Sequence, residues 1–238
     1  MTEMTSITRR RLRTPRMAAL AGIAFAILLI VSLLLIRVSI PETLDDSGAW
    51  LKEHSRRITF AIGLIPFAGI AFLWFLGVIR DRLGEFEDRF FSTVFFGSGL
   101  LFIAMTFISA ATATSLLSVY ALESDTLSQT QTYIFNRVFM YQIINVYGLR
   151  MAGVFMMSLG TIWIKTKIMP RIMVFLTYGL ALMQLFGLNL SLWFSLVFPG
   201  WVLIISIAIL IFNFRQNKNP SLNETDENLH PAANTLID

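Results

Sequence analysis

One stretch of the sequence, residues 138–164, is apolar overall but carries side chains that could bind a ligand. Its polar residues are Tyr141, Gln142, Asn145, Tyr147 and Arg150. At 100° per residue along a helix, Tyr141, Gln142 and Asn145 share one face, whereas Tyr147 and Arg150 lie on another. The chemistry that this pattern supports is the binding of a polar ligand or an anion. These five residues are the candidate polar site.

The depth of Arg150 in a membrane decides what it does. A fixed charge in hydrocarbon is costly, so such residues face a bundle interior or a watery cavity. If only the twenty residues ending at Ile164 cross the hydrocarbon, Arg150 lies about 8 Å deep and its side chain reaches the interface. Its partners would be carbonyls, hydroxyls, lipid phosphate, a bound anion, or the loop acids Glu123 and Asp125. Arg150 is therefore either a structural anchor or a ligand contact.

The residue types that are missing from the apolar stretches exclude several chemistries. There is no cysteine, and neither His54 nor His230 lies in an apolar run, as haem ligation inside the bundle would require. No Asp or Glu lies there either, which argues against proton relays and aspartyl proteolysis. Ser98 lies between two glycines, but a serine nucleophile needs a base. We expect no catalytic residue, no metal site and no cofactor.

Composition places these residues in a helical membrane protein. The chain has 238 residues, 55% of them hydrophobic, and a mean hydropathy of +0.68. Such values are typical of polytopic membrane proteins and predict an all-α bundle. We expect six membrane-spanning helices, at residues 17–40, 58–79, 90–120, 138–164, 172–188 and 192–212. The last two are predicted as a hairpin, because a single helix over the 43 uncharged residues 172–214 would be about 65 Å long.

The basic residues predict the orientation of this six-helix domain, residues 17–214. With both termini cytoplasmic, thirteen of the nineteen Lys and Arg residues lie on the inner side and four in outer loops. This distribution follows the positive-inside rule. Residues 1–16 are then a basic cytoplasmic segment, which either sets topology or binds anionic lipid. Residues 215–238 are a polar tail that we expect to be disordered.

A short inner loop between the second and third predicted spans concentrates charge of both signs. The charged residues that could contact a cytoplasmic partner are Arg80, Asp81, Arg82, Glu85, Asp88 and Arg89. Glu85 and Arg89 are spaced to pair on a helix. The loop is therefore either a docking site or a solvated turn held by its own ion pairs.

Several segments resemble motifs of bacterial integral membrane proteins that have no assigned activity. They are Pro66–Phe75, Arg80–Glu85, Gly97–Leu100, Asn145–Met151 and Val197–Trp201. The resemblance extends from the second to the sixth predicted span. It implies a multi-pass protein of the bacterial cytoplasmic (plasma) membrane and implies no activity.

Three functions are compatible with these patterns. The leading hypothesis is a non-enzymatic membrane component that binds a protein partner, a second copy of itself or a lipid. The alternative is a small transporter or channel with an outward-facing polar vestibule around Arg150. The third is a membrane enzyme that modifies lipids through loop carboxylates such as Asp81. The net charge of +4 comes from the inner loops and does not indicate a nucleic-acid partner.

Overall fold

The computed structural model describes residues 2–40, 49–83, 89–122, 131–167, 169–187 and 192–218, and every element within these ranges is helical. The α-helices are α1 (Thr2–Ser39), α2 (Ala49–Glu53), α3 (Ser55–Leu83), α4 (Arg89–Leu122), α5 (Gln131–Gln142), α6 (Leu149–Thr166), α7 (Arg171–Phe186) and α8 (Val197–Lys218). A π-helix, η2 (Ile143–Gly148), joins α5 to α6, and a 3-10 helix, η3 (Leu192–Leu196), precedes α8. The predicted all-α class is confirmed.

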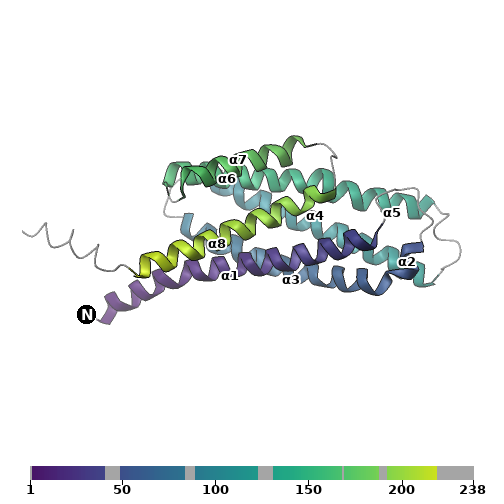
Figure 1. Ribbon diagram of the computed structural model, residues 1–238, viewed down its shortest axis with the longest axis horizontal. Coiled ribbons are helices and arrows are strands. Elements are labelled where there is room, and N and C mark those ends of the chain that lie inside the picture. Colours follow the sequence, from purple (N-terminus) through teal and green to yellow (C-terminus); the bar gives the residue numbers. More distant parts are fainter. Residues whose placement is uncertain are drawn as a thin grey trace, which may run out of the picture.

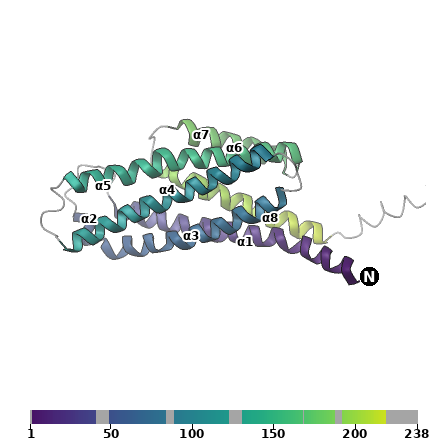
Figure 2. The same cartoon turned by 180° about the vertical axis from the view of Figure 1, so that it is seen from behind.

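The helices form a single elongated bundle (Figures 1 and 2). Helix α1 packs between α3 and α8, α4 packs between α3 and α6, and α7 lies against the outside of α6. The N-terminal end of α1 and the C-terminal end of α8 lie at one end of the bundle, and α2 and α5 lie at the other (Figure 1). We call this second end the α2–α5 end.

The number of helices long enough to cross a membrane differs from the six predicted. Within the described residues, five helical stretches have the length and apolar composition of a membrane span. The stretch predicted as the fifth span is α7, which has 16 residues and is about 24 Å long. A hydrocarbon core is about 30 Å thick. The count of six spans therefore stays a prediction.

One helix begins earlier than predicted. Residues 121–137, between the third and fourth predicted spans, were expected to be a loop, but α5 begins at Gln131 and continues through η2 into α6. The predicted break in the uncharged run is present, because α7 ends at Phe186 and a new helical stretch starts at Leu192, while α7 packs mainly against α6. Helix α4 has 34 residues, in keeping with its long uncharged run. Residues 219–238 of the predicted tail lie outside the described residues.

The end of α6 is defined by local backbone geometry. Lys167 has a left-handed conformation, with φ 54°, and its N–H donates to the Trp163 carbonyl at 2.9 Å. This conformation ends the helix and satisfies a terminal carbonyl. Pro170 follows and lacks the N–H that a continuing helix would need. The chain is thereby turned back into α7.

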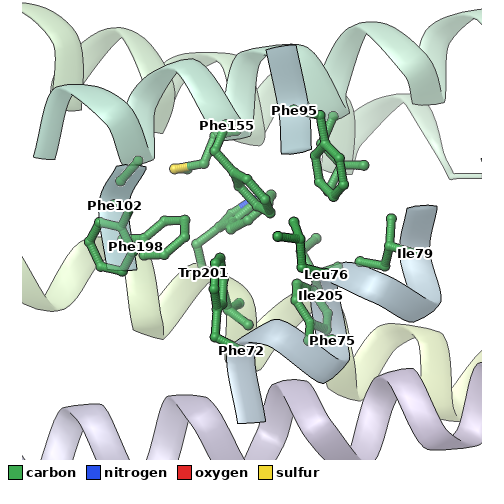
Figure 3. Close-up of a cluster of buried hydrophobic side chains, with 14 of the residues drawn as sticks. Phe72, Phe75, Leu76, Ile79, Phe95, Phe102, Phe155, Phe198, Trp201 and Ile205 are labelled. Atoms are coloured by element: carbon green, nitrogen blue, oxygen red, sulfur yellow. The ribbon is translucent and has the colours of Figure 1, made fainter. Parts of the chain in front are cut away.

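An aromatic cluster forms the centre of the bundle (Figure 3). The Phe72 ring of α3 lies 4.6 Å from the Phe25 ring of α1, 6.0 Å from Phe102 of α4, 5.6 Å from Phe155 of α6 and 5.9 Å from Phe198 of α8, measured between centroids. Phe72 is fully buried. One side chain thus contacts four other helices, and close packing of this kind stabilises helix association in lipid.

Small residues bring α1 close to its two neighbours. A Cβ atom added at Gly22 would meet the Ser206 hydroxyl of α8 and would lie 2.8 Å from the Phe75 ring of α3. Ser32 of α1 donates a buried hydrogen bond of 2.7 Å to the Ala61 carbonyl of α3. Such contacts are typical of helix interfaces in membranes, where small residues allow backbones to approach.

Candidate functional site

A partly open cavity lies within the α2–α5 half of the bundle. Its volume is about 150 Å³. The residues that line it come from α1, α3, α4, α5, η2, α6 and η3: Leu29, Leu33, Ile36, Arg37, Ile40, Ile58, Ile62, Ile65, Phe102, Thr106, Ser109, Ala110, Ala113, Arg137, Met140, Tyr141, Ile144, Asn145, Leu149 and Ser195. Most of these side chains are apolar.

The size of the cavity distinguishes it from a packing defect. A single water needs roughly 10–15 Å³ measured in this way, so the cavity is about ten times larger. Protein interiors contain few voids larger than one water molecule. An opening of this size with an apolar lining is suited to an apolar ligand or to part of one.

Two arginines face the cavity. Arg37 lies near the end of α1, with its guanidinium carbon 5.3 Å from the centre of the Trp193 ring of η3. Arg137 of α5 is only 3% exposed, and its guanidinium carbon lies 5.2 Å from the centre of the Trp50 ring. A cation over an aromatic face is held by the ring quadrupole. Both positive charges are therefore placed at fixed positions beside an apolar space.

Helices α2 and α5 together hold Arg137 in place. Trp50 of α2 donates a buried hydrogen bond of 2.9 Å from Nε1 to the Tyr133 hydroxyl of α5. Trp50 and Tyr133 belong to a second apolar cluster with Leu51, Ile58 and other buried residues of α3 and α4. Arg137 follows Tyr133 by four residues, so both face this cluster.

The structure divides the predicted polar site. Tyr141 and Asn145 line the cavity, whereas Gln142 is exposed and Tyr147 is 57% exposed. Arg150 is half-buried, does not line the cavity, and donates a 2.6 Å hydrogen bond to the Val146 carbonyl. Two of the five predicted residues thus line the cavity, and the arginines that line it are Arg37 and Arg137, not Arg150.

The π-helix explains why these residues separate. In η2 the Leu149 N–H donates to the Ile144 carbonyl, five residues earlier, instead of the usual four. The wider turn changes the relative directions of residues before and after it. Asn145 and Arg150 contact carbonyls within or beside this turn, at Tyr141 and Val146 respectively. In this structure, therefore, the hydrogen bond of Arg150 is with the backbone of its own helix.

Arg37 and Arg137 were not singled out as site residues from the sequence. Arg37 lies near the end of the first predicted span, residues 17–40, and Arg137 lies just before the fourth, residues 138–164. One sequence signal does point to the second residue. Arg137, Tyr141 and Asn145 are spaced four residues apart, which aligns them on one helical face.

The described residues of the predicted inner loop lie at the end of the bundle away from α2 and α5. The guanidinium carbon of Arg80 lies 4.4 Å from the Phe96 ring centre, and Asp81 is exposed. Arg82 and Arg89 lie at the facing ends of α3 and α4. Glu85 and Asp88 lie outside the described residues.

Ser98, the serine between two glycines, makes contacts within its own helix. Its hydroxyl is buried and lies 2.7 Å from the Val94 carbonyl and 3.1 Å from that of Phe95. Within the described ranges, no group of three or more His, Asp or Glu residues is arranged to hold a metal ion.

Comparisons with known proteins add no relative. The sequence matches no protein-family model, no curated protein and no solved structure. The class of protein therefore rests on the structure itself. Large apolar side chains such as Phe67, Trp74, Phe175 and Phe186 are strongly exposed on the outside of the bundle. Together with five helices of spanning length, they define a multi-pass membrane protein whose outer surface contacts lipid.

Proposed function

We propose that the protein is a non-enzymatic component of the bacterial cytoplasmic membrane that binds a lipid-like molecule within its helical bundle. Both termini are cytoplasmic, and α7 is a short sixth span. The α2–α5 end then faces outward. The observation that carries the proposal is the cavity of about 150 Å³, in which an apolar lining is combined with Arg37 and Arg137.

A cavity-filling substitution tests this function. Ala113 lines the cavity on α4, so the ring in Ala113→Phe would occupy part of the space. We expect the wild type to retain bound lipid after purification in neutral detergent and this variant to lose most of it, as measured by native mass spectrometry. Ala111→Phe is the matched control, because Ala111 lies on the same helix but is exposed. Equal lipid retention by Ala113→Phe and the control would contradict the proposal.

Transport is the second candidate, and one observation favours it. Tyr141 and Asn145, which were predicted to line an outer vestibule, both line the cavity. The predominantly apolar lining argues against a path for ions or small polar solutes, because such solutes need polar groups to replace their hydration. Release of a trapped solute from liposomes by the wild type, with loss in Ala113→Phe, would favour transport.

The orientation is tested by single cysteines, since the natural chain has none. We expect Ser47→Cys and Thr126→Cys to react with a membrane-impermeant maleimide in intact cells. Gly84→Cys and Asn217→Cys should react only after the cells are opened, because positively charged segments stay inside. The opposite pattern would place both termini outside.

A further inference from the structure

The cavity lies in the half of the bundle that α8 does not reach. Toward the end that holds the chain termini, α8 packs against α1 and also contacts α6. Helix α8 begins at Val197, however, and toward the α2–α5 end only the short helix η3 precedes it (Figure 1). Ser195 of η3 lines the cavity, so the cavity is located beyond the start of α8.

Four helical stretches surround the cavity, and each presents one face to it. They are α1, α3, α4 and the continuous stretch formed by α5 and η2. Helices α1 and α3 pack together, as do α3 and α4, and α4 packs against both α5 and η2. Across the cavity, the described residues of α1 and α5 make at most isolated contacts with each other. The side between α1 and α5 is therefore the least closely packed side of the cavity.

The exposure of the lining residues identifies the same side. The α3 residues in the lining, Ile58, Ile62 and Ile65, are all buried. By contrast, Ile36 of α1 and Met140 of α5 are half-buried. The cavity thus has a closed floor on α3 and a mouth between α1 and α5, with apolar side chains at both edges. We call this mouth the α1–α5 opening.

The α1–α5 opening lies at the depth of lipid chains. The stretch of α1 with the composition of a membrane span is Met17–Ser39, so its midpoint is Leu28. The cavity residues of α1 extend from Leu29 to Ile40, which is about 16 Å along the helix axis. Half of a hydrocarbon core is about 15 Å thick. The opening therefore faces the acyl chains of one leaflet, the one on the side of the α2–α5 end.

The volume of the cavity limits how much of a lipid it can hold. In another protein, an engineered apolar cavity of about 150 Å³ holds one benzene molecule, which has six carbons. The present cavity has about the same volume. It therefore accommodates a segment of roughly six carbons from one hydrocarbon chain, and the rest of the lipid stays outside.

An empty apolar cavity favours the entry of such a chain. Side chains around an empty space lose their dispersion contacts on one side. Water does not replace these contacts, because an apolar cavity of this size stays dry. A lipid chain at the opening is already out of water, so it restores the contacts without the desolvation of any polar group.

We propose that one acyl chain of a membrane phospholipid enters the cavity sideways through the α1–α5 opening. The chain lies against the floor formed by Ile58, Ile62 and Ile65, and the head group and second chain stay in the surrounding leaflet. This inference rests on the proposed lipid-binding function and adds the class of lipid and its route. With both termini cytoplasmic, the leaflet is the outer one.

Photocrosslinking from a lipid chain tests the proposal. The full chain is placed in phosphatidylcholine nanodiscs in which a small fraction of the lipid carries a diazirine in one acyl chain, and labelled residues are located by mass spectrometry. We expect labelling of Ile62, which lines the cavity but is only 8% exposed. Phe67 is 63% exposed on the same helix and should be labelled by the surrounding lipid. Ile205 is buried in the aromatic cluster, does not line the cavity and gives the background.

Bulky residues at the opening should exclude the chain. Met140→Trp enlarges the side chain at the α5 edge, and labelling of Ile62 should fall at least about fivefold. Phe139→Trp is the matched control, because Phe139 is adjacent, is exposed and does not line the cavity. Ile36→Trp at the α1 edge should act in the same way, with the exposed Val38→Trp as its control. It decides the result if Met140→Trp does not elute as a folded protein in size-exclusion chromatography.

The outcomes separate this inference from the proposed function. Labelling of Ile62 that persists in both Met140→Trp and Ile36→Trp would overturn the route. Labelling by a diazirine-bearing free fatty acid, but not by the phospholipid, would overturn the class of lipid and leave lipid binding intact. Labelling of Ile62 by neither probe above the level of Ile205 would overturn the inference as a whole. The proposed function fails with it only if Ala113→Phe retains as much lipid as its control.

Discussion

Replacement of Phe72 by alanine is expected to lower the free energy of unfolding by about 2–4 kcal/mol. The Phe72 ring is fully buried and has ring contacts with Phe25, Phe102, Phe155 and Phe198, so its loss opens a void shared by five helices. The transfer contribution is smaller than in a water-soluble protein, because unfolded helices stay in lipid. The loss of van der Waals contacts remains.

Denaturation with sodium dodecyl sulfate in mixed micelles, followed by tryptophan fluorescence, measures this change. Phe67→Ala is the control, because Phe67 lies on the same helix and is 63% exposed. Its removal should change the free energy of unfolding by no more than about 0.5 kcal/mol. Similar losses for both variants would mean that the aromatic cluster does not hold the bundle together.

Replacement of Gly22 by leucine is expected to destabilise the bundle by about 3 kcal/mol, at the upper end of the range for overpacking. Even a single Cβ atom would overlap Ser206 and come within 2.8 Å of Phe75, and both of these residues are fully buried. Neither neighbour has free space to move into, so α1 would have to separate from α8 or α3. Three helices would lose contacts at once.

Heating in detergent, with the folded fraction followed by size-exclusion chromatography, measures the effect. Gly63→Leu provides the comparison, because a Cβ atom added there would meet nothing within 4 Å. Leucine also forms helices better than glycine, so this control should be neutral or slightly stabilising. A Gly22→Leu variant as stable as Gly63→Leu would contradict the close approach of α1 to its neighbours.

The fold class was predictable because it depends on the lengths of the apolar runs in the sequence and on the positions of the charged residues that separate them. The 43 uncharged residues 172–214 are too many for one span, and the structure divides them between α7 and α8. Helix boundaries near polar residues were less predictable. Residues 131–137 are polar in sequence yet helical in structure, because tertiary contacts from Trp50 bury Tyr133 and Arg137.

The site was predicted only in part, and the reason is physical. Arg150 was predicted as a site residue because it is a charge in the middle of an apolar run. In the structure, however, its hydrogen bond is with a carbonyl of its own helix. Arg137 lies outside that run, and nothing local indicates that α2 folds over it. The wide turn of η2 also cannot be predicted from a helical projection that assumes 100° per residue. Long-range packing therefore determines which arginine faces the cavity.

The π-helix also determines how far α5 is rotated relative to α6 about their common axis. A regular α-helix turns 100° per residue, and a wide turn accommodates one residue more. If Ile143–Gly148 instead formed a regular α-helix with the same number of residues, α5 would be turned by about 100° relative to α6. Tyr133 and Arg137 would then leave Trp50 and the cavity, while α6 kept its place. The position of the Arg137 charge beside the cavity thus depends on the extra residue that this wide turn accommodates, as well as on residue type.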